Sequence, residues 1–120
     1  MAQGDNLLYK IGLYSLDVRE RVLTREGCVV PLTPKAFETL LVLVRNSGHV
    51  VQKDELMKEV WPDAFVEEAN LTQNIFALRR TLGESTAEPQ YIETVPRRGY
   101  RFVAPVRTIS AAAPASRPRS

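Results

Sequence analysis

The clearest hydrophobic pattern in the chain lies in residues 70–83. Leu71, Ile75, Leu78 and Leu82 recur at spacings of 4, 3 and 4, which places all four on one stripe of an α-helix. Such a stripe is typical of a helix that packs one side against a core while its other side stays in water. We therefore predict an amphipathic helix in this segment.

Polar and small residues mark both ends of this predicted helix. Asn70 stands where an N-cap belongs, and Gln73 three positions later completes a pair that resembles a capping box. Gly83 stands just after the last apolar position, where a residue that is free to take positive φ is favoured. The pattern therefore predicts a helix that begins after Asn70 and ends at Gly83.

The face of this helix opposite the leucine stripe is polar but contains no acid. A solvated face usually mixes acids with bases, because opposite charges four residues apart support the helix. Amides, small side chains and arginines are instead what base edges and phosphates bind. Two interpretations stay open here: an exposed face that happens to lack acids, and a face that reads nucleic acid. The residues concerned are Gln73, Phe76, Ala77 and Arg80, flanked by Thr72, Asn74 and Arg79.

Upstream of this helix, the pattern predicts a small antiparallel sheet followed by two more helices. Residues 9–32 contain short alternating runs, two of which flank Glu26-Gly27, a reasonable hairpin turn. Thr33-Pro34 then provides an N-cap and a proline in the first turn of a helix. We expect this helix to end near residues 46–48. A brief strand at 50–51, a second helix over 53–61 and a loop over 62–70 should follow it.

Downstream of Gly83, two β-rich runs at residues 91–95 and 100–104 predict a hairpin. We expect Gly99 to supply the unusual φ at its tip, residues 96–99. Adjacent arginines at a tip without acids repel each other, which suits a site that reaches for phosphate or a narrow minor groove. A solubilising surface is the alternative interpretation. The arginines are Arg97 and Arg98, with Arg101 on the returning strand.

Length and composition indicate one soluble domain with tails. The chain has 120 residues, of which 44% are hydrophobic and 25% charged, as in ordinary globular proteins. We place the domain at residues 9–106, between a disordered tail at 1–8 and a disordered tail or interdomain linker at 107–120, which is rich in Ala, Pro, Ser and Arg. The net charge of +2 is too small to identify a partner, although 12 of the 16 basic residues are Arg, which favours phosphate and base recognition.

The chain offers no set of residues typical of catalysis or of a cofactor. One cysteine and one histidine cannot form a usual zinc site, and we expect Cys28 to be a buried structural thiol rather than a nucleophile. No paired acids or glycine-rich phosphate loop occur. The absence of an apolar run of about 20 residues and of a signal-peptide core predicts a soluble, cytoplasmic protein. We expect no enzyme, no metal, no cofactor and no small-molecule substrate.

The order of these elements resembles the OmpR/PhoB-type winged-helix DNA-binding domain of bacterial transcription regulators. The resemblance covers residues 9–106 and rests on four motifs in the right order. These are Leu32 to Glu38 (LTPKAFE), Leu56 to Trp61, Asn74-Ile75 with Leu78-Arg79-Arg80 and Leu82, and Ile92-Glu93-Thr94-Val95 with Gly99-Tyr100-Arg101-Phe102.

The resemblance implies an α+β fold, a winged helix-turn-helix with an N-terminal antiparallel β-sheet, three helices and a C-terminal β-hairpin wing. It also implies that the third helix enters the major groove of double-stranded DNA and that the wing crosses to the adjacent minor groove. RNA polymerase would meet the loop at 62–70, and two domains would bind direct repeats head to tail. The residues that the resemblance implies to bind DNA are Asn70, Gln73, Asn74, Ala77 and Arg80 at the bases, Thr72 and Arg79 at phosphates, and Arg97 and Arg98 in the wing. The patterns of the helix face and the returning strand add Phe76 and Arg101 to this set.

Two departures from the family pattern and one rival hypothesis complete the sequence prediction. The family often carries basic residues where Phe76 and Ala77 stand, so we expect a reduced electrostatic affinity of this helix and an altered base preference. The family also usually carries an arginine where Pro96 stands, so we expect the minor-groove contact to depend on compensation by Arg97 and Arg98. The short segment before the first strand predicts an arrangement similar to regulators of the CadC/ToxR type, without a preceding receiver domain, and leaves a membrane-anchored parent protein open. The rival hypothesis is a protein–protein interaction module that uses the exposed face around Phe76.

Overall fold

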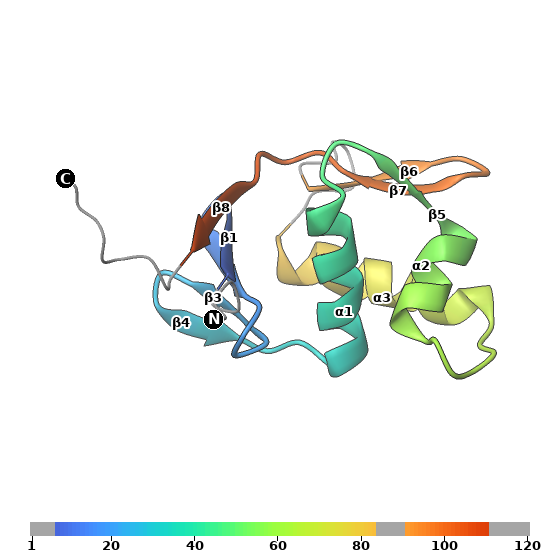
Figure 1. Cartoon of the computed structure of the whole chain (residues 1–120), viewed down its shortest axis with the longest axis horizontal. Coiled ribbons are helices and arrows are strands. Elements are labelled where there is room, and N and C mark those ends of the chain that lie inside the picture. The colour runs from blue at the N-terminus through green and yellow to red at the C-terminus, as the bar shows by residue number, and fades with distance from the viewer. Residues whose placement is uncertain (1–6, 84–90, 111–120) are drawn as a thin grey trace. The chain divides into compact units, whose positions relative to one another are not determined.

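The computed structural model describes residues 7–83 and 91–110 and divides the chain into two compact units. The sheet unit comprises Met1–Pro31 and Pro105–Ser120, and the helical unit comprises Leu32–Ala104. Figure 1 labels most elements of the two units along the chain. As predicted, an antiparallel sheet precedes three helices, and a β-hairpin follows them.

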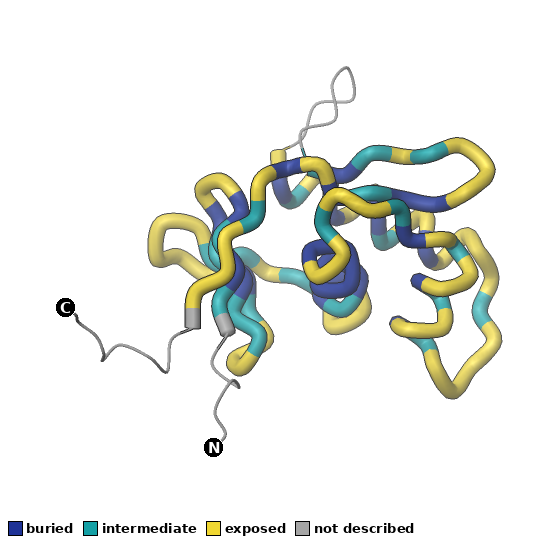
Figure 2. The backbone as a smooth tube through the Cα atoms, turned by 45° about the horizontal axis from the view of Figure 1, so that its top comes forward, coloured by how far each residue is buried: buried dark blue, intermediate teal, exposed yellow. Residues whose placement is uncertain are grey.

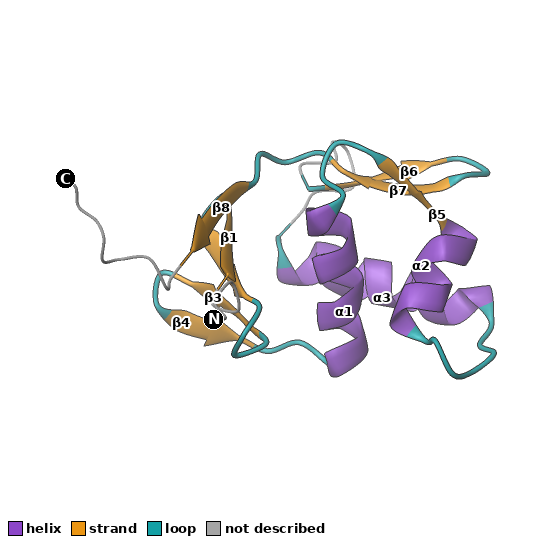
Figure 3. Cartoon of the chain, viewed as in Figure 1, coloured by secondary structure: helices purple, strands orange, loops and turns teal. Residues whose placement is uncertain are grey.

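The sheet unit is a five-stranded antiparallel sheet with the strand order β4-β3-β2-β1-β8 (Figure 3). Buried and partly exposed side chains alternate along three of its strands, with Tyr9, Ile11 and Leu16 buried, as the period of two in a strand requires. Glu26 and Gly27 both take positive φ in the β3–β4 turn, which confirms the predicted hairpin. The strands are β1 (Leu7–Ile11), β2 (Tyr14–Asp17), β3 (Val22–Arg25), β4 (Cys28–Val30) and β8 (Arg107–Ser110).

Strand β8 corrects the predicted ends of the domain. The sequence predicts disorder from residue 107, but Arg107–Ser110 pairs with β1 from Lys10↔Arg107 to Leu7↔Ser110. Strand β1 likewise begins at Leu7, inside the predicted N-terminal tail. Each segment gains its backbone hydrogen bonds from the other, and this long-range pairing leaves no mark on local composition. The rest of both predicted tails, residues 1–6 and 111–120, lies outside the described residues.

The prediction of a buried thiol at Cys28 is wrong. Cys28 is exposed, together with its neighbour Val29. The reason is position: β4 is a strand of three residues at the edge of the sheet, and Cys28 follows the hairpin turn directly. The apolar run that suggested a core strand therefore belongs to an exposed edge.

The helical unit is built around α1 (Pro34–Arg45). This helix contacts α2 (Lys53–Val60), α3 (Glu68–Thr81) and strand β7 (Gly99–Phe102), and Figure 2 shows it as the most continuously buried helix. Strand β7 lies between β5 (Val50–Gln52) and β6 (Ile92–Val95) in a three-stranded antiparallel sheet. Within the described residues, no helix has the length and apolar character needed to cross a bilayer.

The first helix begins as the sequence predicts. The Thr33 hydroxyl accepts a hydrogen bond from the Ala36 N–H at 3.1 Å, and Pro34 occupies the first helical position. From Ala36 to Val44, all residues but Glu38 are buried, including the polar Thr39. An N-cap and a nearly fully buried surface fix α1 as the element on which the other two helices rest.

The third helix confirms the predicted stripe and corrects its predicted start. All four stripe residues are buried, and Gly83 follows the helix with φ 70°. The N-terminus, however, lies at Glu68 with Glu67 as cap, so Asn70 lies in the first turn and is not the N-cap. Acidic residues at this end favour the positive end of the helix dipole, which explains an extension that a capping-box pattern misses.

Candidate nucleic-acid interface

The solvent face of α3 carries most of the residues that the sequence predicts to bind DNA. Six of these side chains are exposed, the first of them Asn70 in the first turn, and no acid occurs among residues 71–83. Water and ligands therefore meet amide, hydroxyl, methyl, aromatic and guanidinium groups along this side. We name the five that follow Asn70 the α3 face; its members are Thr72, Gln73, Phe76, Ala77 and Arg80.

The first turn of α3 presents two short polar side chains. Asn70 is exposed, and its Nδ2 donates to the Glu67 carbonyl at 3.3 Å. The Thr72 hydroxyl donates to the Glu68 carbonyl at 3.3 Å. Both bonds are local and long, and each side chain retains acceptor capacity toward solvent.

Asn74 is directed differently from its neighbours on the helix. It is half-buried, and its Nδ2 donates to the Thr39 hydroxyl of α1 at 3.2 Å. Thr39 is fully buried and donates in turn to the Lys35 carbonyl at 2.8 Å. The structure therefore does not bring Asn74 together with the α3 face. The sequence could not signal this contact, because the two residues are 35 positions apart.

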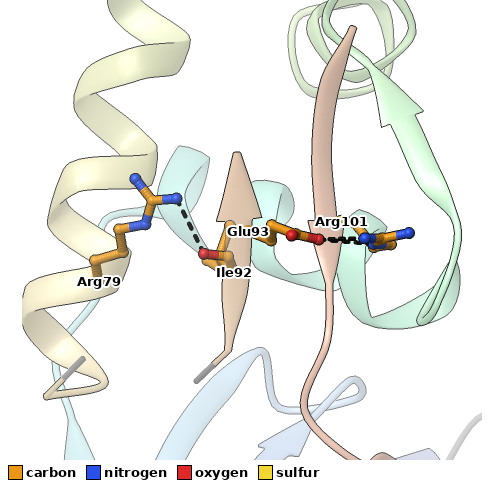
Figure 4. A network of polar contacts seen from close by, with 4 residues as sticks. All are labelled: Arg79, Ile92, Glu93 and Arg101. Atoms are coloured by element: carbon orange, nitrogen blue, oxygen red, sulfur yellow. Dashed lines mark hydrogen bonds and ion pairs between the residues drawn. The ribbon is translucent and has the colours of Figure 1, made fainter. Parts of the chain in front are cut away.

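Arg79 and Arg80 are adjacent in sequence but have different surroundings. Arg79 is half-buried, and its Nη2 donates to the Ile92 carbonyl at 3.0 Å and to the Thr94 hydroxyl at 2.8 Å. Figure 4 shows its guanidinium pointing from α3 to strand β6. Arg79 thus links the last turns of α3 to the hairpin.

Arg80 instead lies one helical turn after Phe76 on the α3 face. Its Cζ lies 5.8 Å from the centroid of the Phe76 ring, within cation–π range. The Phe76 side chain is 61% exposed, and a shallow hollow runs between the two residues, bordered by Ala77 and Thr81. An aromatic ring and a guanidinium are therefore presented together to solvent.

Arg101 is paired within the hairpin. Its Nε donates to Oε1 of Glu93 at 2.9 Å, and its Nη2 forms an ion pair with the same oxygen. Glu93 lies directly opposite on the neighbouring strand (Figure 4). Arg101 thus lies on the returning strand as predicted, but its guanidinium is engaged in a cross-strand pair.

The hairpin tip projects two other arginines. Arg97 and Arg98 are both exposed, and the Arg98 N–H donates to the Val95 carbonyl at 3.0 Å. With Pro96 at the second position and Arg97 at φ 67°, this turn matches type II, in which the third residue takes positive φ. We name β6, residues 96–98 and β7 the wing.

The prediction that Gly99 supplies the positive φ is wrong; Arg97 does so. Gly99 is required for a different reason, the close approach of strand β5. A Cβ at this position would lie 2.0 Å from the Val51 carbonyl oxygen and 2.9 Å from the Gln52 Cα. Only glycine lets β5 and β7 pair at this register.

Lys53 is a residue of the site that the sequence reasoning missed. Its backbone N–H donates to the Arg98 carbonyl at 3.0 Å, and its Nζ forms an ion pair with Glu68 at 2.9 Å. The hydrogen bond to the Glu68 carboxylate raises the pKa of Lys53 above the ordinary value of a lysine. Lys53 therefore connects the wing tip to the start of α3, and only the spatial neighbours reveal this.

The loop between α2 and α3 is shorter than predicted, because α3 begins at Glu68. It exposes Phe65 completely, next to a hollow of about 800 Å³ whose walls include Met57, Trp61 and Pro62. Across the described part of the chain, no three His, Cys, Asp or Glu side chains gather to hold a metal ion.

Comparisons with known proteins agree with this architecture. The model of the family described as "Transcriptional regulatory protein, C terminal" matches residues 19–102. The transcriptional regulator HilA of Salmonella typhimurium is 44% identical over 92 residues, which cover 77% of this chain and 16% of HilA. The chain thus spans about a sixth of the length of that relative.

Two solved structures are similar to this chain. The DNA-binding domain of Escherichia coli CadC is 32% identical with a TM-score of 0.72, covering 82% of this chain and 94% of that one. The Klebsiella pneumoniae RstA DNA-binding domain, solved in complex with the RstA box, is 26% identical with a TM-score of 0.70, covering 80% and 96%. These neighbours confirm the predicted winged-helix fold class.

Proposed function

The chain belongs to the OmpR/PhoB-type family of transcriptional regulators, a non-enzymatic class, and carries its winged-helix DNA-binding domain; from this premise we propose that it binds double-stranded DNA sequence-specifically. In this proposal α3 enters the major groove and the wing crosses to the neighbouring minor groove. The proposal places the domain in the bacterial cytoplasm, where the chromosome lies.

The observation that carries the proposal is the acid-free α3 face. DNA presents a dense line of phosphates, so each carboxylate on a docking helix would oppose binding. Gln73 offers an amide that can bond adenine at two atoms, and Arg80 a guanidinium that can bond guanine at two atoms. Both side chains are exposed. Base reading by these two residues follows from their chemistry and exposure.

The surroundings of the other predicted residues suggest different roles. Exposed Asn70 and Thr72 suit phosphates or bases at the start of α3, and exposed Arg97 and Arg98 suit the minor groove or its phosphates. The hydrogen bonds of Asn74, Arg79 and Arg101 favour positioning instead, because each side chain already binds a group of the domain. We propose that these three residues hold the surface that reads DNA.

A salt series with three variants tests the proposal. Affinity for a DNA site selected from a random pool should fall with salt, with a slope of about −0.9 per phosphate neutralised. Arg80→Ala should cost about 1–3 kcal/mol of binding free energy and relax the preference for one base. Arg98→Ala should weaken binding to all sequences and reduce the salt slope by about 1. Arg45→Ala, an exposed arginine on α1, is the control that should change neither.

The rival function, a protein-interaction module centred on Phe76, shares the observation that this ring is 61% exposed. The salt series separates the two functions, because a largely apolar interface responds weakly to salt. Salt-independent binding of a protein partner through Phe76, with no selection of DNA sequence, would favour the rival.

The resemblance also implies two further partners, RNA polymerase and a second copy of the domain, and we include both in the proposal. The loop before α3 would meet RNA polymerase, and the fully exposed Phe65 beside an apolar hollow supports an interaction at this place. Head-to-tail pairing on direct repeats would raise the affinity of a domain with weak net charge. Sedimentation on DNA with one or two half-sites tests the pairing; equal affinity for both would contradict it.

A further inference from the structure

We infer that Phe76 and Arg80 act as one reading unit that recognises a thymine close to a guanine, an inference that rests on the proposed DNA binding. In this unit the Phe76 ring contacts the 5-methyl group of the thymine, while the Arg80 guanidinium bonds the guanine. The two side chains are exposed together on α3, 5.8 Å apart from Cζ to ring centroid.

The Phe76 ring is the group of the domain that can hold the Arg80 guanidinium in place. Arg80 is exposed, and the described part of the chain gives its guanidinium one partner, the Phe76 ring, and no carboxylate. An unsupported arginine samples many rotamers and loses this freedom when it binds a base. Contact with the ring reduces that loss, and the attraction between cation and ring strengthens when the groove excludes water. Phe76 therefore positions Arg80 as well as contacting DNA.

The exposure of Phe76 gives the ring a second task. Its neighbours on the α3 face are amide, hydroxyl, methyl and guanidinium groups, so the ring is the largest apolar surface there. In the major groove the 5-methyl group of thymine is the apolar group that distinguishes a base pair containing thymine from the others. The hollow along Phe76, Ala77 and Arg80 leaves both the ring and the Ala77 methyl accessible from one side.

Helix and DNA geometry set the spacing of the two bases. Residues four positions apart lie about 6 Å apart along a helix axis. Stacked bases are about 3.4 Å apart along each strand. The thymine and the guanine should therefore lie within about two base pairs of each other.

The experiment removes single methyl groups from the DNA. After selection from a random pool, each thymine of the selected site is replaced in turn by deoxyuridine, which lacks only the methyl group. For the original chain, replacing one thymine near a guanine should lower the affinity about fourfold, which corresponds to the free energy of burying one methyl carbon. Phe76→Ala should bind both duplexes equally and should lose most of its discrimination for the guanine.

Two variants separate the two tasks of the ring. Phe76→Leu keeps an apolar contact but lacks an aromatic face, so it should keep the methyl dependence and lose guanine discrimination. Arg80→Ala should lose guanine discrimination and keep the methyl dependence. Phe65→Ala, which removes a fully exposed phenylalanine outside the α3 face, should keep both properties. Thermal unfolding of all variants checks that these exposed substitutions leave the fold intact.

The outcomes are distinguishable. Equal methyl dependence in the original chain and in Phe76→Ala, or full guanine discrimination in Phe76→Ala, would overturn the reading unit while leaving DNA binding intact. A selected site without a thymine within two base pairs of a guanine would also overturn it. Failure to select any sequence would overturn the proposed function itself.

Discussion

The third helix and the wing both present arginines to solvent, but different forces hold them in place. In α3, a local stripe of leucine and isoleucine fixes which side is buried, so the opposite side is exposed by default. In the wing, the positions of the side chains depend on contacts with residues far away in sequence. Strand β5 approaches Gly99 and the Lys53 N–H binds the Arg98 carbonyl, whereas the positive φ of Arg97 belongs to the local turn.

The α3 face and the wing are two different ways of building a surface that reads DNA. The α3 face tolerates substitution because its exposed side chains carry no part of the packing. The wing has little such freedom, because its backbone is itself in close contact with a neighbouring strand. Changes at a packed backbone position of the wing such as Gly99 should therefore damage the fold, and changes of exposed side chains on the α3 face should alter recognition alone.

Gly99→Ala should have the largest effect on stability. The added Cβ would meet the Val51 carbonyl oxygen at 2.0 Å, and this neighbour is backbone that cannot rotate away. We expect a loss of about 2–4 kcal/mol in the free energy of unfolding, since β5 and β7 must separate. Denaturant unfolding measures the loss.

Gly83→Ala is the matched control for this prediction. Gly83 has φ 70° and nothing within 4 Å of an added Cβ, so only backbone strain opposes alanine there. The expected cost is about 1 kcal/mol. Equal losses for the two variants would contradict the importance of close approach at Gly99 and would leave the wing no more constrained than the end of α3.

The same contrast explains how much the sequence could predict. Local patterns identified the α3 stripe, the Thr33 cap of α1 and the Gly83 terminus, because each depends on residues within a few positions of one another. The pairing of β1 with β8 and the exposure of Cys28 escaped prediction, because both depend on where a strand lies within its sheet. Composition alone does not carry that information.

The residues of the candidate site likewise fall into those that local sequence patterns predict correctly and those whose surroundings depend on distant residues. The residues of the α3 face could be predicted because a helix with one buried side exposes the other. Sequence reasoning gave Asn74, Arg79 and Arg101 the same DNA-binding role, but their partners Thr39, Ile92 and Glu93 lie 35, 13 and 8 residues away. Such partners become visible only when the chain is folded.

Arg79→Ala should have the next largest effect, because it cuts the link between α3 and the wing. Two hydrogen bonds to β6 would be lost, at 3.0 and 2.8 Å, one of them to a backbone carbonyl. We expect a loss of about 1–2 kcal/mol in unfolding free energy, reduced by the partial exposure of the guanidinium. DNA affinity should fall with little change in base preference, and thermal unfolding with gel-shift titration measures both.

Arg80→Ala, one position later, is the control that removes the same charge. It should change stability by no more than about 0.5 kcal/mol, because Arg80 lies on the exposed face. Its effect should fall on base preference. If the two variants behaved alike in stability and in preference, the division between a linking and a reading arginine would be wrong.

Arg97→Gly should produce a smaller change in stability than Gly99→Ala or Arg79→Ala, and in the opposite direction. An L-residue at φ 67° is disfavoured by about 1–2 kcal/mol, whereas glycine adopts this conformation freely. Glycine also makes the unfolded chain more flexible, which costs about 0.4–1 kcal/mol. The net expectation is a gain of about 0.5–1 kcal/mol in stability, together with weaker DNA binding because one cation is lost from the tip.

Arg98→Gly removes the same charge from the same turn, but Arg98 is not at positive φ. It should lower stability slightly and weaken DNA binding to a similar degree, as measured by thermal unfolding and by the salt dependence of affinity. A gain in stability from Arg97→Gly alone, with binding reduced in both, would mean that the wing keeps a strained arginine because DNA requires its charge. If Arg97→Gly bound DNA as tightly as the original chain, the strain would have no connection with recognition, and the wing would act through Arg98 and its backbone alone.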